Sequence, residues 1–371
     1  MYPIMEGPDR IREIHFSMVP KLGPVLSKKV LEYFKSLEAV FNATLKDFLE
    51  IEGIQIKGAE HILRSLENKT IRDRARRELD FIQENRVQCF FILNPDYPFR
   101  LIQCPDPPIL VYFQGTADIN AQKIISIVGS RKATAYGKKL THEFINGLKG
   151  LDLVILSGLA FGIDIQAHRS SMENGIPTIG VLGHGLDLLY PSAHRDISSK
   201  MKRNGGLLTE FCSETPILPG LFPRRNRIIA GLSDALVVVE AADKGGALIT
   251  AELATSYNKE VFAFPGRVND PYSQGCLGLI RDQKAQLILN AGEFLDFMNW
   301  VNPSMHNNDH EEPESAIALK ILNILVQKNK VSISELNKDL GSTIPNIPEI
   351  LLDLEIRGKI RLLPGRILER V

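Results

Sequence analysis

Three arginines and an asparagine follow one aromatic residue in the segment Phe222-Pro223-Arg224-Arg225-Asn226-Arg227. Each guanidinium group offers a planar fork of donors that suits phosphate. Basic side chains at the start of a helix oppose its macrodipole, so the cluster costs local stability unless a negative charge compensates it. An anionic polymer would do so, and Phe222 would stack on bases of any identity. The alternative is that the arginines cap the helix, some of them paired with acids, and that Phe222 packs in the core.

Two apolar runs end abruptly in small residues, in the segments 124–131 (IISIVGSR) and 151–164 (LDLVILSGLAFGID). Such runs predict buried parallel strands. The turns that follow them, Gly129-Ser130 and Ser157-Gly158, let a ligand approach the backbone because they carry little or no side chain. Arg131 stands at the mouth of the first turn, so the pattern predicts a phosphate-binding hollow with an arginine at its edge.

Two further motifs admit more than one interpretation. A glycine pair opens a predicted helix at Lys244-Gly245-Gly246-Ala247, which is a geometry that cradles phosphate. Asp164 and His168 are four residues apart and share one face of a helix. They are either an acid/base pair, or an aspartate that caps its helix and a histidine bonded within the fold.

Strands and helices alternate from residue 124 to about 300. Alternating units of this kind predict a parallel sheet covered on both faces, with its ligands outside the carboxyl ends of the strands. This places the turns at 129–131, 157–158, 183 and 265–266 along one edge. The proline-rich segment 97–115 is expected to be an edge segment of the sheet. The predicted strands are 124–129, 151–158, 178–183, 207–211, 235–241 and 261–266.

The chain is expected to divide into an N-terminal helical (helix-hairpin-helix, SAM-like) domain at 1–86, a Rossmann-like domain at 87–300, a polar linker at 301–315 and a winged-helix domain at 316–371. The hairpins of the first domain either contact DNA or are structural. The last domain either binds DNA or docks a partner, because its Lys and Arg barely outnumber its Asp and Glu.

Composition narrows the class of protein. The 371 residues carry a formal net charge of zero, so a basic groove would be local. The four cysteines are far apart and form no CxxC pair, which disfavours a zinc site and a disulfide framework. No signal peptide opens the chain and no apolar run approaches the length of a membrane span, so we expect a cytoplasmic protein. His184, His194 and the acids show no spacing of metal ligands, so we expect no metal site, and we expect no cofactor.

Taken together, these motifs resemble the DNA-processing protein A family, also called DprA or Smf. The match runs in order from about 97 to 290. It is carried by Tyr97-Pro98, Asp106-Pro107-Pro108, Ile127–Arg131, Tyr136-Gly137, Ser157–Asp164, Ala167-His168, Gly185-Leu186-Asp187, Tyr190-Pro191, Phe222–Ser233, Leu248–Ala251 and Pro265-Gly266. The resemblance implies an extended Rossmann-like core and a single-stranded DNA-binding protein of natural transformation. Such a protein shields incoming DNA, helps to load RecA and forms a dimer through its core, with no catalytic step.

The resemblance also implies which residues bind DNA. Arg131 and the segment Phe222, Arg224, Arg225, Asn226 and Arg227 would line the DNA pocket, and Gly129, Ser130, Ser157, Gly158 and Gly162 would shape its floor. The family usually has Ser-Gly-Ser before Leu-Ile-Thr, where this chain has Lys244-Gly245-Gly246-Ala247, and Lys244 would add a phosphate contact. The alternative is a Rossmann-like nucleoside-monophosphate phosphoribohydrolase, which Gly245-Gly246 followed by Thr250 and Glu252 faintly resembles.

Overall fold

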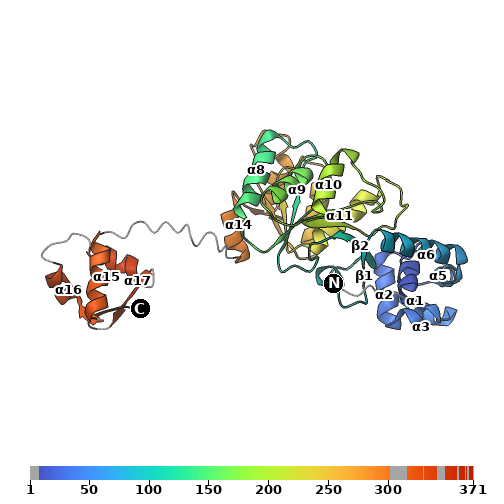
Figure 1. Ribbon diagram of the computed structural model, residues 1–371, viewed down its shortest axis with the longest axis horizontal. Helices are drawn as coiled ribbons and strands as arrows, with labels where there is room; N and C mark the ends of the chain where they lie inside the picture. The colour runs from blue at the N-terminus through green and yellow to red at the C-terminus, as the bar shows by residue number, and fades with distance from the viewer. Residues whose placement is uncertain are drawn as a thin grey trace. The chain divides into compact units, whose positions relative to one another are not determined.

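The computed structural model describes residues 8–300, 316–328, 330–340, 347–356, 359–363, 365 and 367–370. The chain forms two compact units, Met1–Asn302 and Pro303–Val371 (Figure 1). The predicted linker at 301–315 lies outside the described residues. Within the described part of the chain, no helix is both long and apolar enough to cross a membrane.

A nine-stranded sheet forms the centre of the first unit, in the order β1-β2-β6-β5-β4-β3-β7-β8-β9. The neighbouring pairs from β6 to β9 are parallel, whereas β1 pairs with β2 and β2 with β6 in antiparallel fashion. All six predicted strands are present. The strands are β1 (Gln88–Phe91), β2 (Leu110–Gly115), β3 (Ile124–Val128), β4 (Val154–Ser157), β5 (Thr178–Val181), β6 (Gly205–Thr209), β7 (Ala235–Val238), β8 (Glu260–Ala263) and β9 (Gln286–Leu287).

One expectation about this sheet is wrong. Segment 97–115 contains β2, and β2 is not the edge strand of the sheet. The edge strand is β1, which pairs with the outer side of β2. The edge strand β1 follows the N-terminal helices directly.

Helices cover both faces of the sheet, which is why β3 is buried along its whole length. Alternate residues of a strand face opposite sides, and Ile125 and Ile127 join the core beneath α8, whereas Ile124 and Val128 join the core beneath α11. The helices are α7 (Phe99–Ile102), α8 (Ala135–Gly147), α9 (Ile163–Glu173), α10 (Arg195–Met201), α11 (Leu221–Leu232), α12 (Gly246–Ser256), α13 (Gln274–Arg281) and α14 (Ala291–Met298), with a 3-10 turn at Ser192–His194.

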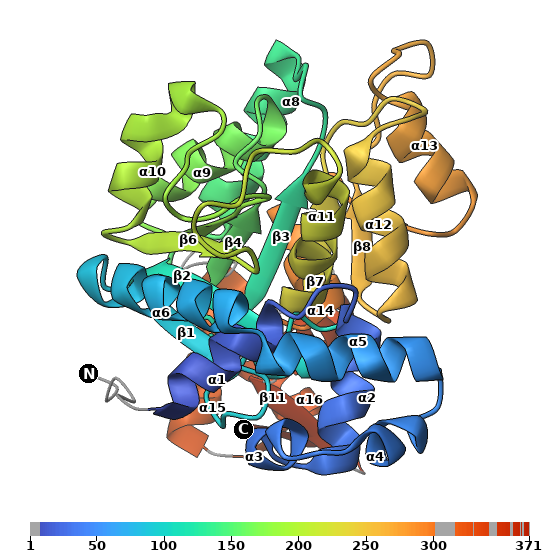
Figure 2. The same cartoon turned by 90° about the vertical axis from the view of Figure 1, so that its right-hand side faces the viewer.

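The N-terminal helices lie at one end of this unit, beside β1 and β2 (Figure 2). Their core continues into the sheet, since Phe91 of β1 and Tyr112 of β2 pack with residues of the helices. The helices are α1 (Pro8–Ser17), α2 (Pro24–Phe34), α3 (Leu37–Phe41), α4 (Leu45–Leu49), α5 (Ile56–Glu67) and α6 (Lys69–Glu84). The predicted helical segments 27–34 and 59–66 fall within α2 and α5.

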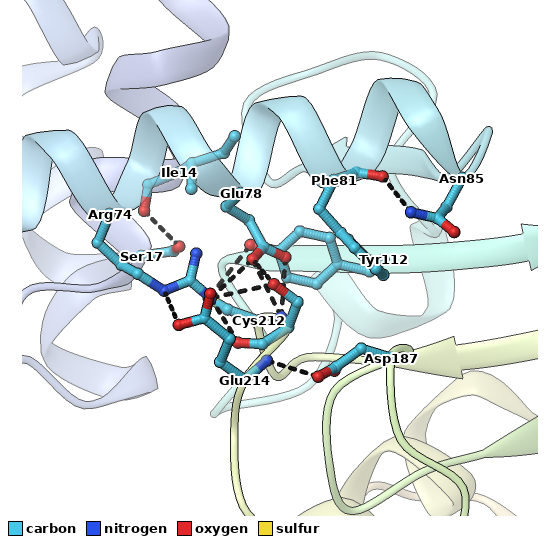
Figure 3. Close-up of polar contacts among 11 residues, drawn as sticks. Ile14, Ser17, Arg74, Glu78, Phe81, Asn85, Tyr112, Asp187, Cys212 and Glu214 are labelled. Atoms are coloured by element: carbon cyan, nitrogen blue, oxygen red, sulfur yellow. Dashed lines mark hydrogen bonds and ion pairs between the residues drawn. The ribbon is translucent and has the colours of Figure 1, made fainter.

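A buried polar contact joins α6 to the segment after β6 (Figure 3). The carboxylate of Glu78 accepts the backbone N–H of Ser213 at 2.9 Å and pairs with Arg74 at 2.9 Å. Arg74 also lies 3.4 Å from Glu214, whose backbone N–H donates to Asp187 at 2.9 Å. The segment around Ser213 is therefore held by a helix on one side and by the loop after β5 on the other.

The described residues of the second unit form three helices and a three-stranded antiparallel sheet of order β10-β12-β11, as the predicted winged helix requires. Its core includes Ile321, Leu336 and Leu354. Gly365 of the predicted wing has a φ of +88°, which glycine adopts readily, and Pro364 lies outside the described residues. The elements are α15 (Ala316–Lys328), β10 (Lys330–Ser332), α16 (Ile333–Asp339), α17 (Ile347–Ile356), β11 (Ile360–Leu363) and β12 (Ile367–Arg370).

Candidate nucleic-acid interface

A cleft of about 790 Å³ opens at the carboxyl ends of the parallel strands, the edge that the sequence predicts for a ligand. We refer to it as the cleft. Its lining comes from several turns and helix starts. It comprises residues 128–132 at and after the end of β3, Ala160 before α9 and Asp164 in its first turn, Tyr190 after β5, Ile217, Pro219, Phe222, Pro223, Arg225, Asn226 and Ile229 in and before α11, Ala241, Ala242, 244–247, Ile249 and Thr250 after β7, and Tyr272.

The floor of the cleft is tightly packed where β3 ends. Gly162 begins α9 with a φ of +83°, and a β-carbon there would collide with the carbonyl oxygen of Ser130. A β-carbon on Gly129 would lie 2.5 Å from Cγ1 of Ile163. Only glycine fits at these two positions, so the turn after β3 rests directly on the first turn of α9.

Glu240, two residues after β7, holds the turn that carries Arg131 and Lys132. Its carbonyl oxygen accepts the N–H of Ser130 at 2.6 Å, and its buried carboxylate accepts the N–H of Thr134 at 2.9 Å. The backbone on both sides of Arg131 is thereby fixed. Sequence reasoning missed Glu240, although an acid at the end of a predicted apolar strand was a visible signal.

Three cationic side chains line the cleft and are exposed, namely Arg131, Lys132 and Lys244. Within the described part of the chain, none of them forms an ion pair with a carboxylate. They are therefore available to an anionic ligand, as the sequence predicts for Arg131 and Lys244. Lys132 was not predicted, and its place beside Arg131 was the signal for it.

Arg225 lines the cleft but is buried, and its N–H groups donate to other groups of the protein. Nη1 donates to the carbonyl of Gly158 at 2.5 Å and also to that of Val181. Burial lowers the pKa of the Arg225 guanidinium to about 10, while neighbouring Asp164 raises it. Burial also raises the pKa of Asp164. Arg225 ties the ends of β4 and β5 together, which is an internal role that the sequence did not predict.

The other two arginines do not line the cleft. Arg227 is buried in an ion pair with Glu210 and donates to the carbonyl of Asp106. Arg224 is 55% exposed, lies 4.0 Å from Glu210 and places its guanidinium 5.4 Å from the ring centre of Phe211. The three arginines of the cluster thus have different surroundings, since Arg225 lines the cleft and the other two do not. For Arg227, the alternative that the sequence left open, pairing with an acid, is the one that the structure shows. Desolvation raises the pKa of Glu210 despite this pairing.

Three of the predicted floor residues lie beneath the cleft and do not line it. Ser157 is fully buried and its hydroxyl donates to the carbonyl of Ile127 at 2.6 Å. Gly158 touches Arg225, and Gly162 supports Ser130. Asn226 does line the cleft, and it accepts from Nε of Arg225 at 3.2 Å.

Two aromatic rings form one side of the cleft. Phe222 and Tyr190 have ring centres 5.8 Å apart and planes inclined at 55°. The backbone N–H of Tyr190 donates to Nε2 of buried His184 at 3.2 Å. The sequence predicted Phe222 but assigned no role in the cleft to Tyr190, for which an aromatic residue after the predicted strand 178–183 was the signal.

Asp164 and His168 do not form an acid/base pair. Nδ1 of fully buried His168 lies 2.7 Å from the hydroxyl of Thr178, which itself donates to the carbonyl of Ile155. The imidazole must therefore donate through Nδ1, and among the described residues its Nε2 has no partner. Asp164 accepts the N–H of Ala160 at 3.4 Å, so both side chains are bonded within the fold.

The sequence model described as "DNA recombination-mediator protein A" matches residues 88–299, and that of a SAM-like helix-hairpin-helix tandem matches residues 14–68. Protein Smf of Synechocystis is 36% identical over 287 residues, which cover 76% of this chain and 70% of that protein. DNA processing protein DprA of Streptococcus pneumoniae is 39% identical over 206 residues, which cover 56% of this chain and 72% of that protein.

Two solved structures are similar over the same region. The crystal structure of DprA from Streptococcus pneumoniae has a TM-score of 0.68 and 33% identity, and the match covers 77% of this chain and 97% of that one. DNA processing protein A from Helicobacter pylori, whose structure was described for its single-stranded DNA binding mode, has a TM-score of 0.53 and 28% identity, covering 58% of this chain and 96% of that one. The chain therefore belongs to the DNA recombination-mediator protein A family, which includes DprA and Smf.

Proposed function

We propose that this protein binds single-stranded DNA in the cleft. The observation that carries the proposal is the set of exposed cations without carboxylate partners, Arg131, Lys132 and Lys244, around a glycine floor and beside an aromatic ring. Positive charge that tracks a backbone, combined with aromatic faces for bases, is the general arrangement of proteins that bind single strands without sequence preference. The single-stranded DNA binding of the Helicobacter pylori protein supports the same assignment.

The cleft suggests how a strand would be held. The three cations would contact phosphates, and the backbone N–H groups that begin α12 at Gly245-Gly246 would add to the positive potential there. Phe222 would offer a face to a base. Arg225, Asn226 and Glu240 would keep the walls in place through their internal bonds. Phosphate contacts carry no base identity, so binding should be general in sequence.

We infer that this binding serves natural transformation, in which the protein would protect incoming DNA and assist RecA in the cytoplasm. The same proposal includes a homodimer that forms through the Rossmann-like core. It also includes domain boundaries at residues 86, 300 and 315. No catalytic step is included. In the phosphoribohydrolase alternative Glu252 would act, but its side chain is exposed and is not part of the cleft lining.

The test is binding of fluorescent oligo-dT, followed by anisotropy. The variant Arg131→Ala/Lys132→Ala/Lys244→Ala should bind far more weakly than the native protein. Arg203→Ala is the matched control, because Arg203 is exposed and lies just before β6, at the opposite edge of the sheet. Equal affinity of the triple variant and the native protein would exclude the cleft as the binding site.

A second assay tests the phosphoribohydrolase alternative. The protein is incubated with nucleoside monophosphates and the mixture is analysed for free base by chromatography. No base should appear. Release of base that disappears in Glu252→Gln would contradict the proposal that the protein is not an enzyme.

A further inference from the structure

Resting on the proposed function, we propose that Tyr190 forms a base subsite in the cleft together with Phe222. In this subsite the exposed face of Tyr190 stacks on one unpaired nucleobase. The ligand is thus a flat aromatic ring carried on a phosphate chain.

The first argument is the exposure of the ring. Tyr190 is 49% exposed and lines the cleft, while its ring centre lies 5.8 Å from that of Phe222 at an inclination of 55°. Tilted rings at this separation leave no room for a base between them, so a base would stack on the outer face of Tyr190. Phe222 then supports the ring from behind and remains free to meet a second base.

The second argument is that the position of Tyr190 is fixed before any ligand arrives. Its N–H is held by His184, whose other nitrogen, Nδ1, lies 2.9 Å from the carbonyl of Gly185. Asp187, three residues before Tyr190, accepts the N–H of Glu214 at 2.9 Å. These bonds fix the backbone that carries the ring, so the loop loses little conformational freedom on binding, which favours affinity.

The third argument is the distance between the aromatic and the cationic parts of the cleft. Tyr190 follows β5, whereas Arg131 follows β3, which is two strands away in the sheet. Neighbouring strands are about 4.8 Å apart, so the ends of β3 and β5 are separated by roughly 10 Å. Both residues line the same cleft. A nucleotide carries its phosphate at one end and its base at the other. With the phosphate at Arg131, the strand can place a base toward Tyr190.

The test compares two ligands of equal charge, oligo-dT and an oligonucleotide of the same length with abasic sites throughout. Stacking on an aromatic ring is worth about 1–3 kcal/mol per base, so Tyr190→Ala should weaken oligo-dT binding by roughly 5- to 150-fold. The same variant should bind the abasic strand as well as the native protein does, because the phosphate contacts are unchanged. Tyr190→Phe should restore most of the lost affinity, since it keeps the ring.

Tyr33→Ala is the matched control. Tyr33 in α2 is also 49% exposed, and its ring makes an edge contact with Phe34 at 5.0 Å. This substitution removes a similar ring from a surface outside the cleft and should leave both affinities unchanged. Thermal unfolding of each variant shows whether the fold is retained.

Two outcomes would overturn the inference. Either Tyr190→Ala binds oligo-dT as tightly as the native protein, or it loses the same factor against both oligonucleotides, which would mean that it acts on the phosphate contacts or on the shape of the cleft. Failure of the native protein to bind oligo-dT at all would instead overturn the proposed function.

Discussion

The salt dependence of DNA binding should report how many phosphates the cleft contacts. For single strands, the logarithm of the binding constant falls against the logarithm of the salt concentration with a slope of about −0.7 per phosphate contact. Three exposed cations line the cleft, namely Arg131, Lys132 and Lys244. Three contacts predict a slope of roughly −2.1, which is an affinity loss of about 18-fold between 50 and 200 mM salt.

Removing one of these cations should change the slope as well as the affinity. Arg131→Ala leaves two contacts and a slope of about −1.4, so the loss over the same salt range falls to about 7-fold. The assay is a salt titration of oligo-dT binding by fluorescence anisotropy. Arg203→Ala, at the opposite edge of the sheet, should keep the native slope.

A flat salt response of the native protein would refute binding led by the phosphate backbone. An unchanged slope in Arg131→Ala would show that this side chain makes no phosphate contact. A drop of the same size in Arg224→Ala, whose side chain does not line the cleft, would show that the strand runs further than the cleft does.

Phe222→Ala should weaken oligo-dT binding by about 1–3 kcal/mol if the ring stacks on a base, with retention of the fold checked by circular dichroism. Glu78→Ala should lower the free energy of unfolding by about 1–3 kcal/mol in chemical denaturation, because it leaves the buried N–H of Ser213 without its acceptor, while Arg74 keeps Glu214 and Ser213 as partners. Burial lowers the pKa of His168 to about 3, so the unfolded chain binds the extra proton first. Stability should therefore fall by about 1.4 kcal/mol per pH unit as the pH drops from 6.5 toward 3, and His168→Asn should show a shallower fall in urea titrations at each pH.

Much of the sheet was predictable because its central strands are short apolar runs that end in small residues. The edges were not. The strand β9 has only two residues, both exposed, so it leaves no apolar pattern in the sequence. The strand β1 was hidden because it follows the N-terminal helices without a turn motif that would separate it from them.

The cleft was predictable in its location and only partly in its residues. The spacing of Arg224, Arg225 and Arg227 says which of them share a helix face, but not which acids or carbonyls lie opposite. Those partners come from distant parts of the chain, such as Glu210 for Arg227 and the carbonyl of Gly158 for Arg225. An arginine in a motif therefore predicts a charge in the region, and the tertiary contacts decide whether that charge reaches a ligand.

The contact between Glu78 and Ser213 also sets an order of events during synthesis. The two residues are 135 positions apart, so the N-terminal helices leave the ribosome long before the segment that seals their surface. At about 5–20 residues per second, that delay is roughly 7–27 s. During this interval the carboxylate of Glu78 can pair with Arg74 of its own helix but lacks the N–H of Ser213, so this face of the nascent domain stays open to solvent and to chaperones.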